Sequence, residues 1–170
     1  MLGIITPTKN RSEFVIRELH YYASVECPYT IYLGDSSEEE HREKVLSVID
    51  KLRGNLNVVY QYYPDTNGHV AMKKLAESVS EKYMVFSPDD DFLVPNSLRK
   101  CVEFLETNHD YATAQGNAIL LTLDKSGAYG NIRSLSPYSL RDNQYETPSE
   151  RLIHFLDNYW VTEFSVHRTK

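Results

Sequence analysis

The sequence predicts an α/β fold in which a mainly parallel, Rossmann-like sheet carries helices on both faces. Short apolar runs alternate along the chain with segments whose apolar residues recur at helical spacing. Strands that are separated by helices pair in parallel through right-handed crossovers, which places helices on both faces. Residues 83–86 are apolar without alternation, as expected of a strand that is covered on both faces.

Composition and charge exclude several classes of protein. The 170 residues are 41% hydrophobic and 25% charged, which fits one globular domain and excludes a disordered chain. A net charge of −6 argues against a nucleic-acid partner. The sequence has no apolar run of membrane-spanning length and no signal-peptide pattern. Two distant cysteines, Cys27 and Cys101, predict neither a disulfide nor a zinc site. We therefore expect a cytoplasmic protein, with peripheral membrane contact left open.

The first strand is expected at residues 2–6, and Pro7 is expected to end it because proline lacks a backbone N–H. Asn10 and Glu13 then have the spacing of a capping box at the start of a helix. The apolar face of this helix consists of Val15, Leu19 and Tyr22.

A second strand is expected at residues 30–33, followed by a turn at residues 34–36. Ser37 and Glu40 form another capping box, and Gly54 is placed as the C′ residue of the helix that follows. The apolar face of this helix consists of Val45, Val48, Ile49 and Leu52.

The third and fourth strands are expected at residues 56–62 and 83–86, with a turn at residues 64–68 and a helix between them. The helix after the fourth strand opens at Pro95 and Asn96. The apolar faces of these two helices consist of Met72, Leu75, Ala76 and Val79, and of Leu98, Cys101, Val102 and Leu105.

The remainder of the chain gives weaker signals. Residues 111–115 and 118–123 are expected to be strands, whereas residues 124–146 are polar and show no period. The final helix has the capping residues Thr147, Pro148 and Glu150 and the apolar face Leu152, Phe155, Leu156 and Tyr159. Because no linker or repeat interrupts the pattern, residues 1–170 are expected to form a single domain.

Ligands of such a sheet bind beyond the carboxyl ends of its strands, so the residues that follow each strand are the candidate site. They comprise hydroxyls, cations and carboxylates, which are chemically complementary. These residues are Thr6, Pro7, Thr8, Lys9, Asn10 and Arg11, then Asp35, then Asn67, Gly68 and His69, and finally Asp89, Asp90 and Asp91. Lys73, just after Gly68, adds a cation that could meet a phosphate.

The triple aspartate predicts a site for a divalent cation. In an extended chain Asp89 and Asp91 point the same way, with Cα atoms about 6.6 Å apart, while Asp90 faces the other side. Two crowded carboxylates repel each other, and Mg²⁺ or Mn²⁺, which prefer oxygen ligands, would remove that repulsion. The alternative is a solvated loop before an acidic helix start.

The other candidates also have structural alternatives. Asp35 is either a turn or cap residue or an acceptor of hydrogen bonds from a base or ribose. Residues 8–11 could form a polar loop, and Lys73 could face solvent. Gly68 supplies either a turn conformation or room for a ligand. The sequence contains no Ser-His-Asp order and no phosphate-loop or GxGxxG fingerprint after the first strand.

Three segments, in the right order, resemble motifs of one known family. They are Ile4-Ile5-Thr6-Pro7-Thr8-Lys9-Asn10-Arg11, then Tyr32-Leu33-Gly34-Asp35-Ser36-Ser37, and then residues 83–95. These segments look like the opening strand and loop, the aspartate that contacts the nucleotide base, and the Asp-x-Asp region of the family 2 glycosyltransferases, which have the GT-A fold. Residues 67–76 resemble the helix before that region, and the resemblance covers about residues 1–123.

The resemblance implies transfer of a sugar, with inversion, from a nucleoside-diphosphate sugar (a UDP-sugar favoured) to a hydroxyl of a saccharide or lipid-linked acceptor. The donor-binding residues that it implies are Thr6, Pro7, Thr8, Arg11, Asp35, Asp89 and Asp90, and the argument from strand ends adds Asn67, Gly68 and Lys73. Asp91 would be the principal ligand of Mn²⁺ or Mg²⁺, with Asp89 as the second, and the cation would stabilise the leaving diphosphate. Residues 1–123 would bind the donor, and residues 124–170 would be the incomplete start of the acceptor side.

The chain also departs from the family pattern. Pro88 stands where many members carry a further aspartate, so the motif could shift by one residue. The general base of the family lies in a later segment, and residues 164–170 resemble the lead-in to that segment. Asp157 and Glu163 are the nearest carboxylates for a base, although both favour a structural role.

Other functions would leave different signs in the sequence or in an assay. A nucleotidyltransferase of related fold would need a Gly-rich, basic loop after the first strand, of which residues 6–9 are a weak version. A phospho-receiver domain would need an acidic pair there, where this chain has Thr-Pro-Thr. A non-catalytic module that binds a nucleotide sugar would bind the donor without releasing a product.

Overall fold

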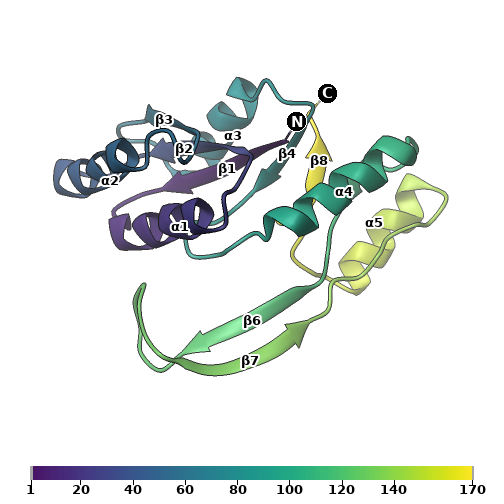
Figure 1. The fold of residues 1–170 in the computed structure, drawn as a ribbon. Coiled ribbons are helices and arrows are strands. Elements are labelled where there is room, and N and C mark those ends of the chain that lie inside the picture. Colours follow the sequence, from purple (N-terminus) through teal and green to yellow (C-terminus); the bar gives the residue numbers. More distant parts are fainter. Residues whose placement is uncertain (1, 170) are drawn as a thin grey trace.

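The computed structural model describes residues 2–169, which form the predicted α/β fold with a mainly parallel sheet (Figure 1). Every helix and strand that the sequence predicts is present, and β7 and β8 are additional. The elements are β1 (Leu2–Thr8), α1 (Ser12–Ser24), β2 (Thr30–Asp35), α2 (Glu39–Lys51), β3 (Val58–Tyr62), α3 (Gly68–Ser78), β4 (Tyr83–Phe86), α4 (Pro95–Thr107), β5 (Thr113–Ala114), β6 (Ala118–Leu123), β7 (Ile132–Tyr138), α5 (Pro148–Asp157) and β8 (Val166–Arg168).

The main sheet has the strand order β3-β2-β1-β4-β8-β5. Its first four strands are parallel, whereas β8 is antiparallel to both β4 and β5. β6 and β7 form a separate antiparallel hairpin that runs along the side of the molecule where α1 and α4 lie (Figure 1). The sequence did not predict β7, because its residues are all exposed and serine and proline interrupt its apolar positions, nor β8, which has only three residues.

Pro7 does not end β1, contrary to the expectation from its missing N–H. β1 pairs with β4 as far as Ile5, whose carbonyl accepts the Ser87 amide, while the Thr8 carbonyl accepts the Ser36 amide from the β2 side. Because successive residues of a strand face opposite neighbours, Pro7 faces the β4 side, beyond the end of that strand. No ladder hydrogen bond is needed there, so β1 continues to Thr8.

The capping boxes expected for α1 and α2 are wrong, and their residues instead join two loops. α1 follows Arg11 and α2 follows Glu38, and neither residue caps its helix with its side chain. Asn10, with a φ of 55°, accepts the Glu38 amide on its side chain (2.8 Å), and its own amide donates to Ser37 Oγ (2.7 Å). The loop after β1 is thereby fixed to the loop after β2.

One further helix end differs from expectation and two are confirmed. α4 begins at Pro95, as expected, although the N-cap residue that precedes it is Val94 and not Asn96. Gly54, with a φ of 90°, lies two residues beyond the C-cap of α2. The capping box of Thr147 and Glu150 at the start of α5 is present with both of its hydrogen bonds.

Two apolar clusters lie on opposite faces of the sheet. The helices α1, α2 and α4 cover one face with the buried side chains Val15, Leu19, Tyr22, Val45, Leu98 and Leu105. α3 covers the other face, where Leu75 and Val79 pack with Ile5 and Tyr32. A Cβ atom at Gly34 would lie 2.7 Å from Leu75 Cδ1, so this glycine of β2 permits the close approach of α3.

The predicted apolar face of α5 is exposed instead of buried. Leu152, Leu156 and Tyr159 are 58%, 65% and 75% exposed, because α5 lies beside the sheet instead of on it (Figure 1). Phe155 contacts the buried Trp160 edge-on. The hairpin also exposes apolar residues, among them Ile119, Leu120, Leu121, Ile132 and Leu135. Among the helices of residues 2–169, none has the length and apolar character needed to cross a bilayer.

Arg168 anchors β8 to the rest of the sheet. Its Nε donates to the Tyr111 carbonyl (3.0 Å) and its Nη1 to the Tyr83 hydroxyl (3.1 Å). Its Nη2 donates to the carbonyls of Leu105 (2.6 Å) and Asn108 (3.3 Å), which belong to the C-terminal end of α4. A cation is favourable at that end of a helix. One side chain therefore joins β4, β8 and α4.

Candidate functional site

A cavity of about 170 Å³ lies at the carboxyl ends of β1 and β4, where the sequence places the site. β1 and the loop after it contribute one wall, and the segment after β4 contributes another. Because β8 runs antiparallel to β4, the residues that precede β8 also arrive at this end of β4. The cavity is lined by Pro7, Arg11, Met72, Phe86, Ser87, Pro88, Asp89, Asp90 and Glu163.

The three aspartates lie in a tight turn at residues 88–91, here called the aspartate turn. The Asp91 amide donates to the Pro88 carbonyl (3.1 Å), and β4 has already ended at Phe86. The extended conformation expected for Asp89 and Asp91 is therefore absent, because the proline and the turn follow directly after the strand. Asp89 is buried, whereas Asp90 and Asp91 are exposed.

Arg11 and Thr8 hold two of the three carboxylates. The Thr8 hydroxyl donates to Asp89 Oδ2 (2.7 Å), and Arg11 Nε forms an ion pair with Asp89 Oδ1 (3.1 Å). Arg11 Nη2 donates to Asp90 Oδ2 (2.7 Å). Burial raises the pKa of Asp89 and outweighs the opposing effects of Thr8 and Arg11. Burial alone would lower the pKa of Arg11, but the neighbouring aspartates raise it overall, so the guanidinium stays charged.

Asp91 differs from the other two aspartates. Within residues 2–169, no hydrogen bond or ion pair holds its carboxylate. Partial burial of the carboxyl raises the pKa of Asp91, and the charges of Asp90, Glu163 and Asp89 raise it further while Arg17 lowers it. A carboxylate that is crowded by like charges gains stability from a cation. Asp91 is thus the aspartate that remains open to a ligand.

Glu18 lies fully buried beneath the aspartate turn and was missed by the sequence reasoning. Its Oε1 accepts hydrogen bonds from the hydroxyls of Thr6 and Ser87 (3.2 Å each), while Oε2 has no partner in residues 2–169. Burial raises the pKa of Glu18 well above its ordinary value, and two nearby aspartates add to the rise. Its position within the apolar face of α1, next to Leu19, was the available signal.

Replacing Glu18 with glutamine is expected to flatten the pH dependence of unfolding. The folded protein keeps the Glu18 proton above the pH at which an unfolded glutamate loses it. The stability that this group contributes is complete below the unfolded pKa and falls as the pH rises toward the folded pKa, by up to about 1.4 kcal/mol per pH unit. Urea unfolding of both proteins from about pH 5 to 8 measures the slope. The control Glu43→Gln, on the exposed side of α2, retains the wild-type slope, and a wild-type slope in Glu18→Gln would contradict a neutral Glu18.

Asp35 is fully buried at the end of β2. Its Oδ1 accepts the Ser37 amide (2.8 Å) and its Oδ2 accepts the Tyr60 hydroxyl (2.9 Å). Burial and the hydrogen bond with Asp35 raise the pKa of Tyr60 to about 12. Next to this pair, the Arg42 guanidinium lies 3.8 Å from the centre of the Tyr62 ring. Asp35 thus has the aromatic side chain of Tyr60 as a direct partner, and the Arg42 guanidinium lies beside Tyr60.

Of the expected site residues, Pro7, Arg11, Asp89, Asp90 and Glu163 line the cavity, whereas the others, Asp91, Thr6, Thr8 and Asp35 among them, do not. Asn67 caps α3 by accepting the Val70 amide, and exposed Lys73 lies 3.8 Å from Glu77. Gly68 is the first residue of α3, so the turn conformation expected for it is wrong. The positive φ in this loop is at Asp65 instead. A Cβ atom at Gly68 would lie within 4 Å of no other atom. The exposed residues His69, Lys9 and Asp157 also lie outside the lining of the cavity.

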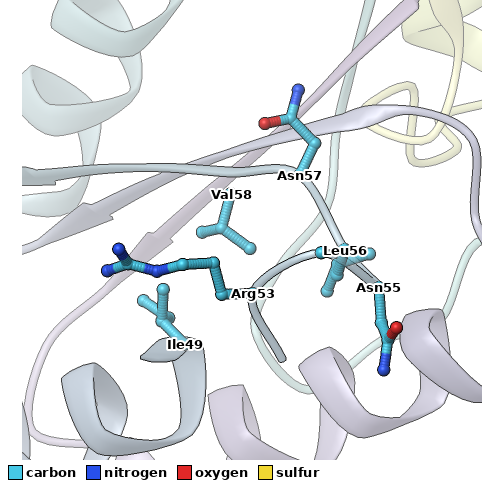
Figure 2. Close-up of a pocket in the computed structure, with 7 residues that line it drawn as sticks. Ile49, Arg53, Asn55, Leu56, Asn57 and Val58 are labelled. Carbon is cyan, nitrogen blue, oxygen red and sulfur yellow. The ribbon is translucent and has the colours of Figure 1, made fainter. Parts of the chain in front are cut away.

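A second cavity, of about 460 Å³, lies at the opposite edge of the sheet. Figure 2 shows its residues around the loop between α2 and β3, at the amino end of β3. Arg53 is the one charged side chain among the lining residues, and no sequence-predicted site residue is present. Since ligands of parallel sheets bind at the carboxyl ends of strands, the smaller cavity at the aspartate turn is the candidate site.

Residues 3–158 match the model of the family described as glycosyl transferase family 2. The chain belongs to this family. Membership confirms the resemblance that the three sequence segments carry, and it accounts for the GT-A arrangement of the sheet. A comparison with the curated proteins gives no match for this family 2 glycosyltransferase chain.

Solved structures have the same fold. S. aureus TarS 1-349 has 15% identity and a TM-score of 0.61, covering 99% of this chain and 47% of that one. The same protein in complex with UDP-GlcNAc has 16% identity and a TM-score of 0.60, covering 99% and 45%. The mannosyltransferase PcManGT from Pyrobaculum calidifontis, in complex with GDP-Man and Mn²⁺, has 15% identity and a TM-score of 0.57, covering 67% and 34%. The chain thus spans less than half of the length of these structures.

The aspartate turn of this family 2 chain presents carboxylate oxygens, which are the ligands that a hard cation prefers. No group of three or more His, Cys, Asp or Glu side chains in residues 2–169 forms a ready metal site. Mg²⁺ usually binds through one or two carboxylates and fills its other positions with water and phosphate oxygens. The uncommitted Asp91 fits that requirement, whereas Asp89 fits it only after exchanging its ion pair with Arg11.

Proposed function

We propose that the chain binds a nucleoside-diphosphate sugar in the cavity at the aspartate turn and transfers the sugar, with inversion, to a hydroxyl of a saccharide or lipid-linked acceptor. The observation that carries this proposal is the uncommitted carboxylate of Asp91 in the aspartate turn, whose neighbours Asp89 and Asp90 line the cavity and are held by Arg11. A UDP-sugar is the favoured donor, which is supported by the complex of S. aureus TarS with UDP-GlcNAc. Residues 1–123 would form the donor side and residues 124–170 part of the acceptor side.

In this proposal, Asp91 and, secondarily, Asp89 would hold Mn²⁺ or Mg²⁺. The bound cation would supply charge stabilisation for the leaving nucleoside diphosphate. Arg11 keeps the charges of Asp89 and Asp90 balanced and places a cation at the wall of the cavity. Thr8 holds the Asp89 carboxylate, and buried Glu18 holds the hydroxyls of Thr6 and Ser87 below it.

An inverting transfer also needs a general base beside the acceptor hydroxyl. Of the two carboxylates considered from the sequence, Glu163 lines the cavity, because β8 brings its preceding segment to the end of β4. Asp157 lies at the exposed end of α5, outside the lining. Glu163 is therefore the candidate base of this proposal.

A nucleotide screen by thermal unfolding tests the proposal. UDP-, GDP-, CDP- and dTDP-sugars are each added with and without Mn²⁺, and one of them is expected to raise the melting temperature only when Mn²⁺ is present. A ligand that binds only the folded state stabilises it by about 2.7 kcal/mol at one hundred times its dissociation constant. If no donor raises the melting temperature, donor binding is contradicted. Release of nucleoside diphosphate during incubation distinguishes a transferase from a non-catalytic binding module.

A further inference from the structure

Arg17 reaches from α1 to two segments that are distant in the sequence. Its Nη2 donates to the backbone carbonyl of Asp90 in the aspartate turn (2.9 Å). Its Nη1 donates to the backbone carbonyl of Ala128 (2.5 Å), which lies in the hairpin connection, defined as residues 124–131 between β6 and β7. One guanidinium therefore bridges the aspartate turn and the hairpin connection.

Besides the two carbonyls, the Arg17 guanidinium contacts aromatic rings and pairs with no carboxylate of residues 2–169. It lies 5.3 Å from the centre of the Phe14 ring and 4.9 Å from that of Phe92, which follows the aspartate turn. Within residues 2–169, Arg17 makes no ion pair with an acid. A planar guanidinium can donate in two fixed directions at once and stack on aromatic rings, whereas a lysine ammonium cannot replace that geometry.

The hairpin connection has few other ties to the main sheet. β6 and β7 pair with each other and form a sheet separate from the main one, and Figure 1 shows the connection on the side of α1. Ala128 is 2% exposed, whereas the neighbouring Tyr129 and Lys125 are exposed. The hydrogen bond from Arg17 thus holds Ala128, the buried residue of a loop whose other residues face solvent.

We propose that Arg17 is a positioning residue that couples the aspartate turn to the hairpin connection, so that nucleotide bound at the turn steadies the hairpin. The coupling deepens the proposed function and rests on it, because it requires that the turn bind the donor. Coupling is reciprocal, so loss of the link must both loosen the hairpin connection and weaken nucleotide binding. Asp91 shares the turn with the carbonyl that Arg17 holds, and a displaced turn would misplace its carboxylate.

The test compares wild type with Arg17→Gln and Arg17→Lys, and uses Arg53→Gln at the opposite edge of the sheet as a matched control. Trypsin cleavage after Lys125 measures opening of the connection. Calorimetry in the presence of Mn²⁺ measures the dissociation constant of the nucleotide. The nucleotide is UDP, unless GDP, CDP or dTDP stabilises the wild type more, in which case that nucleotide is used. Both Arg17 variants are expected to be cleaved about fivefold faster and to bind about tenfold more weakly, with a nearly unchanged melting temperature. The nucleotide slows cleavage of wild type and of Arg53→Gln, but not of the Arg17 variants.

Three outcomes would overturn the inference. Equal cleavage rates and equal dissociation constants in wild type and Arg17→Gln would refute the coupling but would leave the proposed function intact. Wild-type behaviour of Arg17→Lys, which keeps the charge and most of the side-chain length, would show that charge suffices and that no bridge is needed. If wild type binds none of the four nucleotides with Mn²⁺, the proposed function fails, and the coupling fails with it.

Discussion

Replacing Asp91 with asparagine is expected to abolish Mn²⁺-dependent binding of the nucleoside diphosphate, by about 100-fold or more in dissociation constant. Asparagine keeps the size of the side chain but removes the charge of the one aspartate in the turn that Arg11 and Thr8 do not engage. Calorimetry with and without Mn²⁺ measures the effect. The melting temperature should stay the same or rise, because the raised pKa of Asp91 means that its charge disfavours the folded state at neutral pH.

The exposed Asp110 supplies a matched control, since Asp110→Asn removes an equal charge far along the chain from the aspartate turn. It should bind nucleotide and Mn²⁺ like wild type. Undiminished metal-dependent binding by Asp91→Asn would contradict the assignment of Asp91. The same result together with a loss in Asp89→Asn would move the principal ligand to Asp89.

Replacing Arg168 with methionine is expected to lower the free energy of unfolding by about 2–4 kcal/mol. Methionine retains an apolar chain of similar length, but it leaves the carbonyls of Tyr111, Leu105 and Asn108 without their charged donor. The favourable charge at the C-terminal end of α4 is lost as well. Urea unfolding followed by circular dichroism measures the difference.

Arg133→Met on the exposed strand β7 is the control for Arg168→Met, and its stability should change by less than about 0.5 kcal/mol. An equally small loss in Arg168→Met would mean that β8 is held mainly by its ladder with β4 and β5. Because Glu163 precedes β8, the destabilised variant should also lose order at that side of the cavity.

The order of elements and the location of the candidate site were predictable because both depend on local pattern and a general rule of parallel sheets. The apolar stripes predicted that Leu19 and Leu98 are buried, and the rule that ligands bind at carboxyl ends of strands selected Thr8 and Asp89. Glu18 was also within reach, because a charged residue inside an apolar helical face must find partners or remain neutral. Its partner hydroxyls come from two strands, which only the assembled sheet brings together.

Features that depend on neighbouring segments were not predictable from local pattern. Pro7 continues β1 because β4 ends early, and Asn10 bonds to the loop before α2 instead of capping its own helix. The aspartate turn departs from an extended chain because its backbone closes a hydrogen bond to Pro88. The stripe on α5 resembles a core face, yet α5 lies beside the sheet, so Leu156 stays exposed.

The place of β8 has a consequence for how the protein is made. The strands β1 to β4 and their helices can assemble while the ribosome is still adding later residues, but the free edge of β4 then stays open until Arg168 has emerged. An unpaired strand edge is a template for association with other nascent chains. Chaperone demand during synthesis should therefore be concentrated in the interval between the appearance of β4 and that of β8.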